Sequence, residues 1–236
     1  GLTRTFNEAI KVYDTVKETG ITFQLGHQNR QVEANEKAKQ IIDRGLLGPI
    51  NMVELTTNRN SPWGAWVWDI HPEGNAKTID WKTFQEPVAL RNRIPFGDEA
   101  LKRFFRWRCW YDYGTGLSGD LLSHDYDTIN QIMNIGIPKY ASSTGGIYFY
   151  KDGRDVPDVW NATFEFPDKD LTVLYSATLS SNNPRGNRIM GHDATMMMGG
   201  QSGGGNIHGF IVTPDDASTQ YRDRIKNGII NTRYPM

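Results

Sequence analysis

The segment Trp110-Tyr-Asp-Tyr-Gly-Thr-Gly-Leu-Ser-Gly-Asp-Leu-Leu-Ser-His-Asp-Tyr-Asp127 joins an aromatic, glycine-rich loop to a predicted helix. At about 100° per residue, the apolar side chains between Gly119 and about Asn134 fall within one arc of the helix and predict its buried face. These side chains are Leu121, Leu122, Tyr126, Ile129, Ile132 and Met133. Ser118 is the expected N-cap. The pattern predicts an amphipathic helix that packs on a core.

A row of polar residues occupies the opposite face of this helix. Its members follow the spacing i, i+4, i+7 and i+11, and they are Asp120, His124, Asp127 and Gln131. Such a row can be a solvated surface. An Asp near a His can also orient the imidazole and form a proton-transfer pair. Glycines precede the helix and remove Cβ atoms where a ligand could approach. They favour a functional role for Asp120 and His124.

Composition excludes several classes of partner. The 236 residues contain 26 Lys and Arg against 27 Asp and Glu, so no global attraction to nucleic acid or to an anionic membrane follows. No apolar run approaches the roughly 20 residues that cross a bilayer. Cys109 is the single cysteine, which excludes an internal disulfide and a cysteine-based zinc site. We expect no metal. The absence of a targeting segment says little about the compartment.

The first 30 residues have the pattern of an αβ unit. A helix is predicted from Thr5 or Asn7 to about Thr19, followed by a buried strand over Ile21 to Leu25. The strand leads into His27-Gln-Asn-Arg30, at the edge where open α/β sheets bind ligands. The alternative for this tetrapeptide is a simple surface loop. We interpret residues 1–30 as the end of a dinucleotide-binding domain and residues 31–236 as a second domain.

The second domain is predicted to be α+β. A helix over Val32 to Arg44 precedes the first strand, and the central helix is followed by mostly antiparallel strands. The predicted strands are Ile50–Thr57, Tyr140–Tyr150, Val159–Phe166, Leu171–Leu179, Ala194–Met198 and Ile207–Val212, with a last helix over Ser218–Asn227. We expect an open sheet with helices packed on one face.

Two aromatic stretches are candidates for ligand binding. Ser61 to Trp68 contains three tryptophans, Trp63, Trp66 and Trp68, which either fold back as a hydrophobic plug or line a ligand cleft. Leu101 to Trp110 interleaves basic and aromatic residues, as some single-strand-binding proteins do. The balanced charge argues against nucleic acid and favours guanidinium groups that reach acidic partners or a hydroxyl-rich ligand.

Three features together resemble the glucose–fructose oxidoreductase/inositol dehydrogenase (Gfo/Idh/MocA) superfamily. They are the segment that runs into His27-Gln-Asn-Arg30, the turn Arg44-Gly-Leu-Leu-Gly-Pro-Ile50, and Asp112-Tyr-Gly-Thr-Gly116 followed by Gly119-Asp120-x-x-x-His124. The resemblance covers most of the chain. It implies a Rossmann domain that binds NAD or NADP and a carboxyl-terminal α+β domain that binds a sugar or polyol and often forms the oligomer.

The resemblance also implies roles for individual residues. His124 would accept the proton of the substrate hydroxyl while hydride leaves for the nicotinamide, and Asp120 would support it. The residues expected at the substrate are Arg30, Trp63, Trp66, Arg108, Tyr111 and Tyr113, and those expected at the cofactor are Gln28 and Arg30. A homodimer or larger oligomer through the uncovered sheet face is also expected.

The departures from the family pattern are equally specific. The sequence has no Gly-x-Gly-x-x-Gly between a predicted strand and a helix, since its one match, Gly114 to Gly119, follows an aromatic loop. It also has no first βαβ unit and no Glu-Lys-Pro before Leu2. We therefore expect the chain to begin just after the family's lysine, to bind NAD(P) weakly or not at all, and to be inactive by itself. The alternatives are an NAD-dependent glycosidase and a non-catalytic carbohydrate-binding or structural relative.

Overall fold

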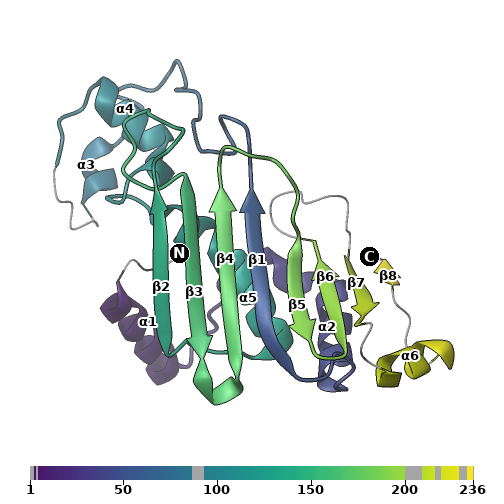
Figure 1. Cartoon of the computed structure of the whole chain (residues 1–236). Helices are drawn as coiled ribbons and strands as arrows, with labels where there is room; N and C mark the ends of the chain where they lie inside the picture. The colour runs from purple at the N-terminus through teal and green to yellow at the C-terminus, as the bar shows by residue number, and fades with distance from the viewer. Residues whose placement is uncertain are drawn as a thin grey trace.

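The protein is built around one open sheet (Figure 1). The computed structural model describes residue 3 and residues 5–86, 93–199, 209–215, 219–228 and 233–235. Its 8-stranded sheet has the order β2-β3-β4-β1-β5-β6-β7-β8. The strands β1 and β4 are parallel, and the other neighbouring pairs are antiparallel. The prediction of an open, mostly antiparallel sheet in an α+β fold is confirmed.

The strands are β1 Ile50–Asn58, β2 Tyr140–Gly146, β3 Val159–Phe166, β4 Leu171–Thr178, β5 Asn187–Gly191, β6 Ala194–Met198, β7 Gly209–Pro214 and β8 Arg233–Pro235. Strict alternation of burial along β4 places every second side chain in the core. The strand β5 was not predicted because it is short and follows a proline- and glycine-containing turn. Of the predicted strand Ile207–Val212, residues 207 and 208 lie outside the described residues.

The helices are α1 Phe6–Thr19, α2 Glu33–Asp43, α3 Trp81–Gln85, α4 Asp98–Phe105, α5 Ser123–Met133 and α6 Thr219–Lys226. Figure 1 shows α2 and α5 behind the sheet, whose front face is uncovered. Buried residues of α2, of α5 and of the rear sheet face form one hydrophobic core. The short helices α3 and α4 lie at one end of the sheet and enclose a smaller apolar cluster.

In the amino-terminal segment the predicted helix is present, but the predicted strand is not. Helix α1 begins at a capping box, in which the Glu8 amide donates to Thr5 Oγ1 and the Thr5 amide donates to Glu8 Oε2. Residues 21–25 do not form the predicted buried strand. Ile21, Phe23 and Leu25 are 46% to 55% exposed. A strand needs a neighbouring strand to pair its backbone groups, and none of the described strands lies beside this segment.

The central helix is correct from Ser123 onward, but a π-helical turn, Ser118–Leu122, precedes it. A Cβ atom at Gly119 would lie 1.7 Å from Thr115 Oγ1, so this close approach requires glycine. The predicted cap by Ser118 is wrong, because its hydroxyl donates to the Thr115 carbonyl at 2.7 Å. Such turns place side chains off the regular α-helical lattice and are frequent at functional sites. The turn carries Asp120.

The helices within the described ranges are all too short or too polar to span a bilayer.

Candidate functional site

His124 and Asp120 line a cavity of about 550 Å³. The other walls come from the apolar side of α1, from the segment 23–27 and from the start of the central helix, with Ala9, Val12, Tyr13, Val16, Phe23, Leu25, His27 and Ser123 among the lining residues. The cavity is therefore mainly apolar, with a few titratable groups at one end. This composition is typical of a small-molecule site.

His124 is the candidate proton acceptor in this cavity. Burial, followed by the neighbouring His27, lowers the pKa of His124 below its ordinary value of 6.5. The two imidazole rings are 5.3 Å apart between centroids and tilted by 38°. The His124 Nδ1 atom is buried and has no hydrogen-bond partner. His124 is therefore a neutral imidazole at neutral pH, with one ring nitrogen left without a protein partner.

Asp120 is paired with a cation rather than with His124. The Arg108 Nε atom donates to Asp120 Oδ1 at 2.8 Å, and the same guanidinium group lies 4.2 Å from the Trp107 ring centroid. The negative charge of Asp120 raises the pKa of His124 and opposes the effect of burial. Asp120 can thus support a protonated His124 through its charge.

Asp127 and Gln131 hold the loop that carries His27. Arg30 donates from Nε and Nη2 to the two Asp127 oxygens at 2.7 and 2.6 Å, and this pairing raises the Arg30 pKa. Gln131 Nε2 donates to the Arg30 carbonyl at 2.9 Å. His27 Nδ1 lies 3.2 Å from Asp127 Oδ2, but the geometry is not that of a hydrogen bond. The polar row of the central helix is therefore divided between a cavity and a structural contact.

A second cavity, of about 500 Å³, adjoins the first at Asp120. Asn58, Arg59, Asn60, Ser61, Trp63, Trp66, Trp68, Arg108 and Asn182 also line it. Trp66 is 2% exposed, whereas Trp63 and Trp68 are 63% and 39% exposed. Trp66 thus packs into the core, as the hydrophobic-plug interpretation expects, although it also reaches this cavity. Trp63 and Trp68 border the cavity from more exposed positions, and a ligand there stays a prediction.

The remaining predicted residues lie apart from these cavities. Tyr113 packs against Trp81 and Phe84 in the smaller apolar cluster, and burial raises the pKa of its hydroxyl. Tyr111 is 40% exposed, and its amide donates to Asp155. Gln28 is exposed at the start of a short 3-10 helix, Gln28–Gln31. The structure does not bring these three residues to His124, and their roles stay predictions.

Other candidate sites have a structural explanation. A cavity of about 700 Å³ beside α3 contains a single carboxylate, Asp80, which accepts from the Thr83 amide as the N-cap. Burial raises the pKa of the Cys109 thiol to about 11, so Cys109 is an unreactive thiol. The described part of the chain has no group of three or more His, Cys, Asp or Glu that could hold a metal ion.

Three residues of the site were not among the predicted site residues. His27 contacts the catalytic candidate, Trp68 stacks on Trp63, and Arg59 lines the second cavity. The one signal for His27 in the sequence was its position after the apolar segment 21–25. Arg59 follows β1 directly, at a strand end where ligands often bind. Neither signal shows that His27 contacts His124 or that Arg59 lines a cavity with Asp120, because these residues are distant in sequence.

No protein-family model matches the sequence, and no curated protein matches it. Solved structures do match. The WlbA dehydrogenase from Bordetella pertussis, in complex with NADH and UDP-GlcNAcA, has a TM-score of 0.60 and 15% identity over 99% of this chain and 60% of that one. An inositol dehydrogenase homolog from Azotobacter vinelandii, with NADH and myo-inositol, has a TM-score of 0.62 and 15% identity over 91% and 46%.

A levoglucosan dehydrogenase in complex with NADH and L-sorbose has a TM-score of 0.61 and 18% identity, over 92% of this chain and 50% of that one. The chain spans about half the length of these dehydrogenases. At such low identity the likeness concerns the fold. The chain therefore shares the fold of about half of each of these dehydrogenases, which were solved with NADH.

Proposed function

We propose that the chain is the substrate-binding part of an NAD(P)-dependent sugar or polyol oxidoreductase. One observation carries the proposal. A neutral His124 with an unpartnered ring nitrogen lies beside Asp120 in a mainly apolar cavity. The fold supports it, because similar structures hold NADH together with UDP-GlcNAcA, myo-inositol or L-sorbose.

The proposed chemistry is the oxidation of a secondary alcohol. A bound nicotinamide would supply the hydride acceptor for this reaction. His124 accepts the proton of the hydroxyl group, because burial keeps the imidazole neutral. The charge of Asp120 favours the imidazolium ion that forms. The Arg108 side chain orients Asp120 through the 2.8 Å contact.

The described residues do not form a dinucleotide site. The one Gly-x-Gly-x-x-Gly, Gly114 to Gly119, follows a turn and not a strand, so it lacks the strand–turn–helix setting of a dinucleotide site, and the guanidinium group of Arg30 is engaged by Asp127. We therefore propose that residues 1–30 are the end of a nicotinamide-binding domain. The exposed apolar side chains of this segment support the proposal, since a covering domain would bury them. They are Phe6, Ile10 and Ile21, which are 42% to 74% exposed and are not among the residues that line the His124 cavity.

The test compares this chain with a protein that carries the proposed nicotinamide-binding domain before residue 1, called the extended protein. NADH is titrated into both and followed by fluorescence, and both are assayed for NAD(P) reduction with monosaccharides and polyols. We expect saturable binding and turnover in the extended protein and neither in residues 1–236. Saturable binding by residues 1–236 contradicts the domain assignment. Release of free sugar from a glycoside without net NADH identifies a glycosidase instead.

We further propose that the uncovered face of the sheet forms a homodimer. Leu174, Met197 and Ile211 lie in one cross-strand row with the pair Glu54 and Arg188, whose charged atoms are 2.9 Å apart. These three apolar side chains are only half-buried in one chain. Light scattering should show a dimer that Leu174→Glu converts into a monomer, because the substitution buries a second carboxylate beside Glu54. A monomeric wild-type chain contradicts this proposal.

A further inference from the structure

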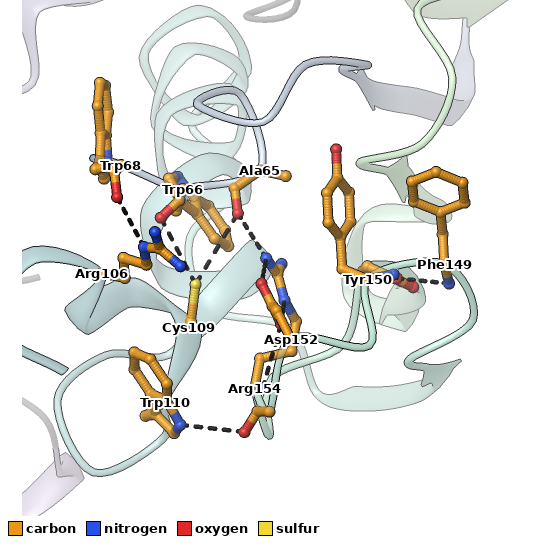
Figure 2. A network of polar contacts seen from close by, with 12 residues as sticks. Ala65, Trp66, Trp68, Arg106, Cys109, Trp110, Phe149, Tyr150, Asp152 and Arg154 are labelled. Carbon is orange, nitrogen blue, oxygen red and sulfur yellow. Dashed lines mark hydrogen bonds and ion pairs between the residues drawn. The ribbon is translucent and has the colours of Figure 1, made fainter. Parts of the chain in front are cut away.

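Side chains from outside the tryptophan-rich loop contact its backbone carbonyl groups and hold it in place. Arg154 Nη2 donates to the Ala65 carbonyl at 2.9 Å, and Arg106 Nε donates to the Trp68 carbonyl at 2.7 Å (Figure 2). The Cys109 Sγ atom lies 3.8 Å from the Trp66 carbonyl. Three side chains from outside the loop thus fix the backbone of residues 65–68.

The backbone of this loop also contains an unfavourable conformation. Trp66 has a φ angle of 65°, which is rare for a residue with a bulky side chain. Its buried indole anchors the loop in the core. Strained residues that the surrounding structure holds in place are concentrated at ligand sites. The anchoring and the strain together indicate a loop with a binding role.

The loop holds two indole rings at the surface. The Trp63 and Trp68 rings are 5.4 Å apart and 21° from parallel, and they are 63% and 39% exposed. A stacked pair of exposed indoles on a fixed backbone is a preformed apolar platform. A ligand that stacks on it does not have to order a flexible loop, so less conformational entropy is lost on binding.

The surroundings of the platform are polar. Arg59, Asn60, Asn182 and the pair of Arg108 with Asp120 line the same cavity. Arg59 has no ion-pair partner in the described part of the chain, and burial lowers its pKa. Hydrogen-bond donors and acceptors around a flat apolar surface match a pyranose ring, which has hydroxyl groups at its rim and apolar C–H faces.

We propose that Trp63 and Trp68 form a subsite for a second pyranose ring, so that the substrate is a glycoside rather than a free monosaccharide. This inference rests on the proposed reaction at His124. The geometry supports it because Asp120 lines both cavities, which places the second ring next to the reacting one. The reacting ring lies in the His124 cavity, and its glycosidic partner stacks on the indoles.

Titration of residues 1–236 with sugars tests the subsite. Cellobiose, maltose and lactose are compared with glucose and galactose, and the indole signals of Trp63 and Trp68 are followed by NMR. We expect at least one disaccharide to bind about tenfold more tightly than its monosaccharides. Trp63→Ala and Trp68→Ala should remove that difference, and Trp63→Phe should keep most of it. Tyr140→Ala is the control, because Tyr140 is an exposed aromatic residue on β2.

Equal binding of mono- and disaccharides contradicts the subsite, and so does tighter binding of uridine diphosphate than of any disaccharide. Unchanged disaccharide affinity in Trp63→Ala and Trp68→Ala also contradicts it. The extended protein separates this inference from the proposed reaction. If the extended protein oxidises sugars and neither Trp63→Ala nor Trp68→Ala changes the rate, the subsite is contradicted but the proposed reaction is not. Disaccharide binding at the indoles without any NAD(P) reduction removes the oxidoreductase and leaves a carbohydrate-binding module.

Discussion

In the extended protein with the proposed nicotinamide-binding domain, His124→Ala should lower kcat for sugar oxidation by about 100- to 10,000-fold, the range typical of a lost general base. NADH affinity should stay nearly unchanged, because the imidazole lies in the substrate cavity. Initial rates and NADH fluorescence titrations measure the two quantities. His192→Ala is the matched control, since His192 is an exposed histidine on a distant loop, paired with Asp193.

The pH dependence of the wild-type protein is a second measure of the same role. Burial lowers the pKa of His124 in the folded protein, so its imidazole is neutral and able to accept a proton at neutral pH. As the pH falls through the lowered pKa, the imidazole becomes protonated and kcat/KM for oxidation should decrease. A His124→Ala protein that retains more than about a tenth of the wild-type activity contradicts the assignment. So does a His124→Ala protein whose kcat/KM decreases at low pH in the same way as that of the wild-type protein.

Arg154→Met should lower the free energy of unfolding of residues 1–236 by about 1 to 3 kcal/mol, as expected when a buried donor is removed and its hydrogen-bond acceptors lose their partner. The Arg154 side chain is 0% exposed and donates to both Asp152 oxygens at 2.8 Å. Its loss leaves the Asp152 carboxylate and the Ala65 carbonyl without their buried donor (Figure 2). Urea unfolding followed by circular dichroism measures the change.

Lys39→Met is the control for Arg154→Met. The Lys39 and Asp43 side chains form an exposed pair one helical turn apart, so its loss should cost less than about 1 kcal/mol. If both variants lose the same small amount, Arg154 does not hold the tryptophan-rich loop in the way that its contacts indicate. A strongly destabilised Arg154→Met that is still folded should also show altered indole signals for Trp63 and Trp68.

The candidate site was predicted in part. His124 and Asp120 were identified because a helix brings residues four apart to one face, which is a local property of the chain. The partners of this helix were not predictable. Arg30 lies 97 residues from Asp127 and contacts it only because the loop after α1 folds against α5. Asp127 lies on the same helix face as His124, as its spacing predicts. The spacing did not reveal that Asp127 forms a structural contact with Arg30.

The sequence by itself determined most of the helices and strands, the α+β class and the polar pair at the centre of the proposed site, because hydrophobic periodicity and caps act over a few residues. The tertiary structure decided the rest. Residues 21–25 form no strand without a neighbour, and Trp66 is buried while Trp63 and Trp68 remain exposed. Burial and strand pairing depend on contacts between segments distant in sequence, which local patterns do not contain.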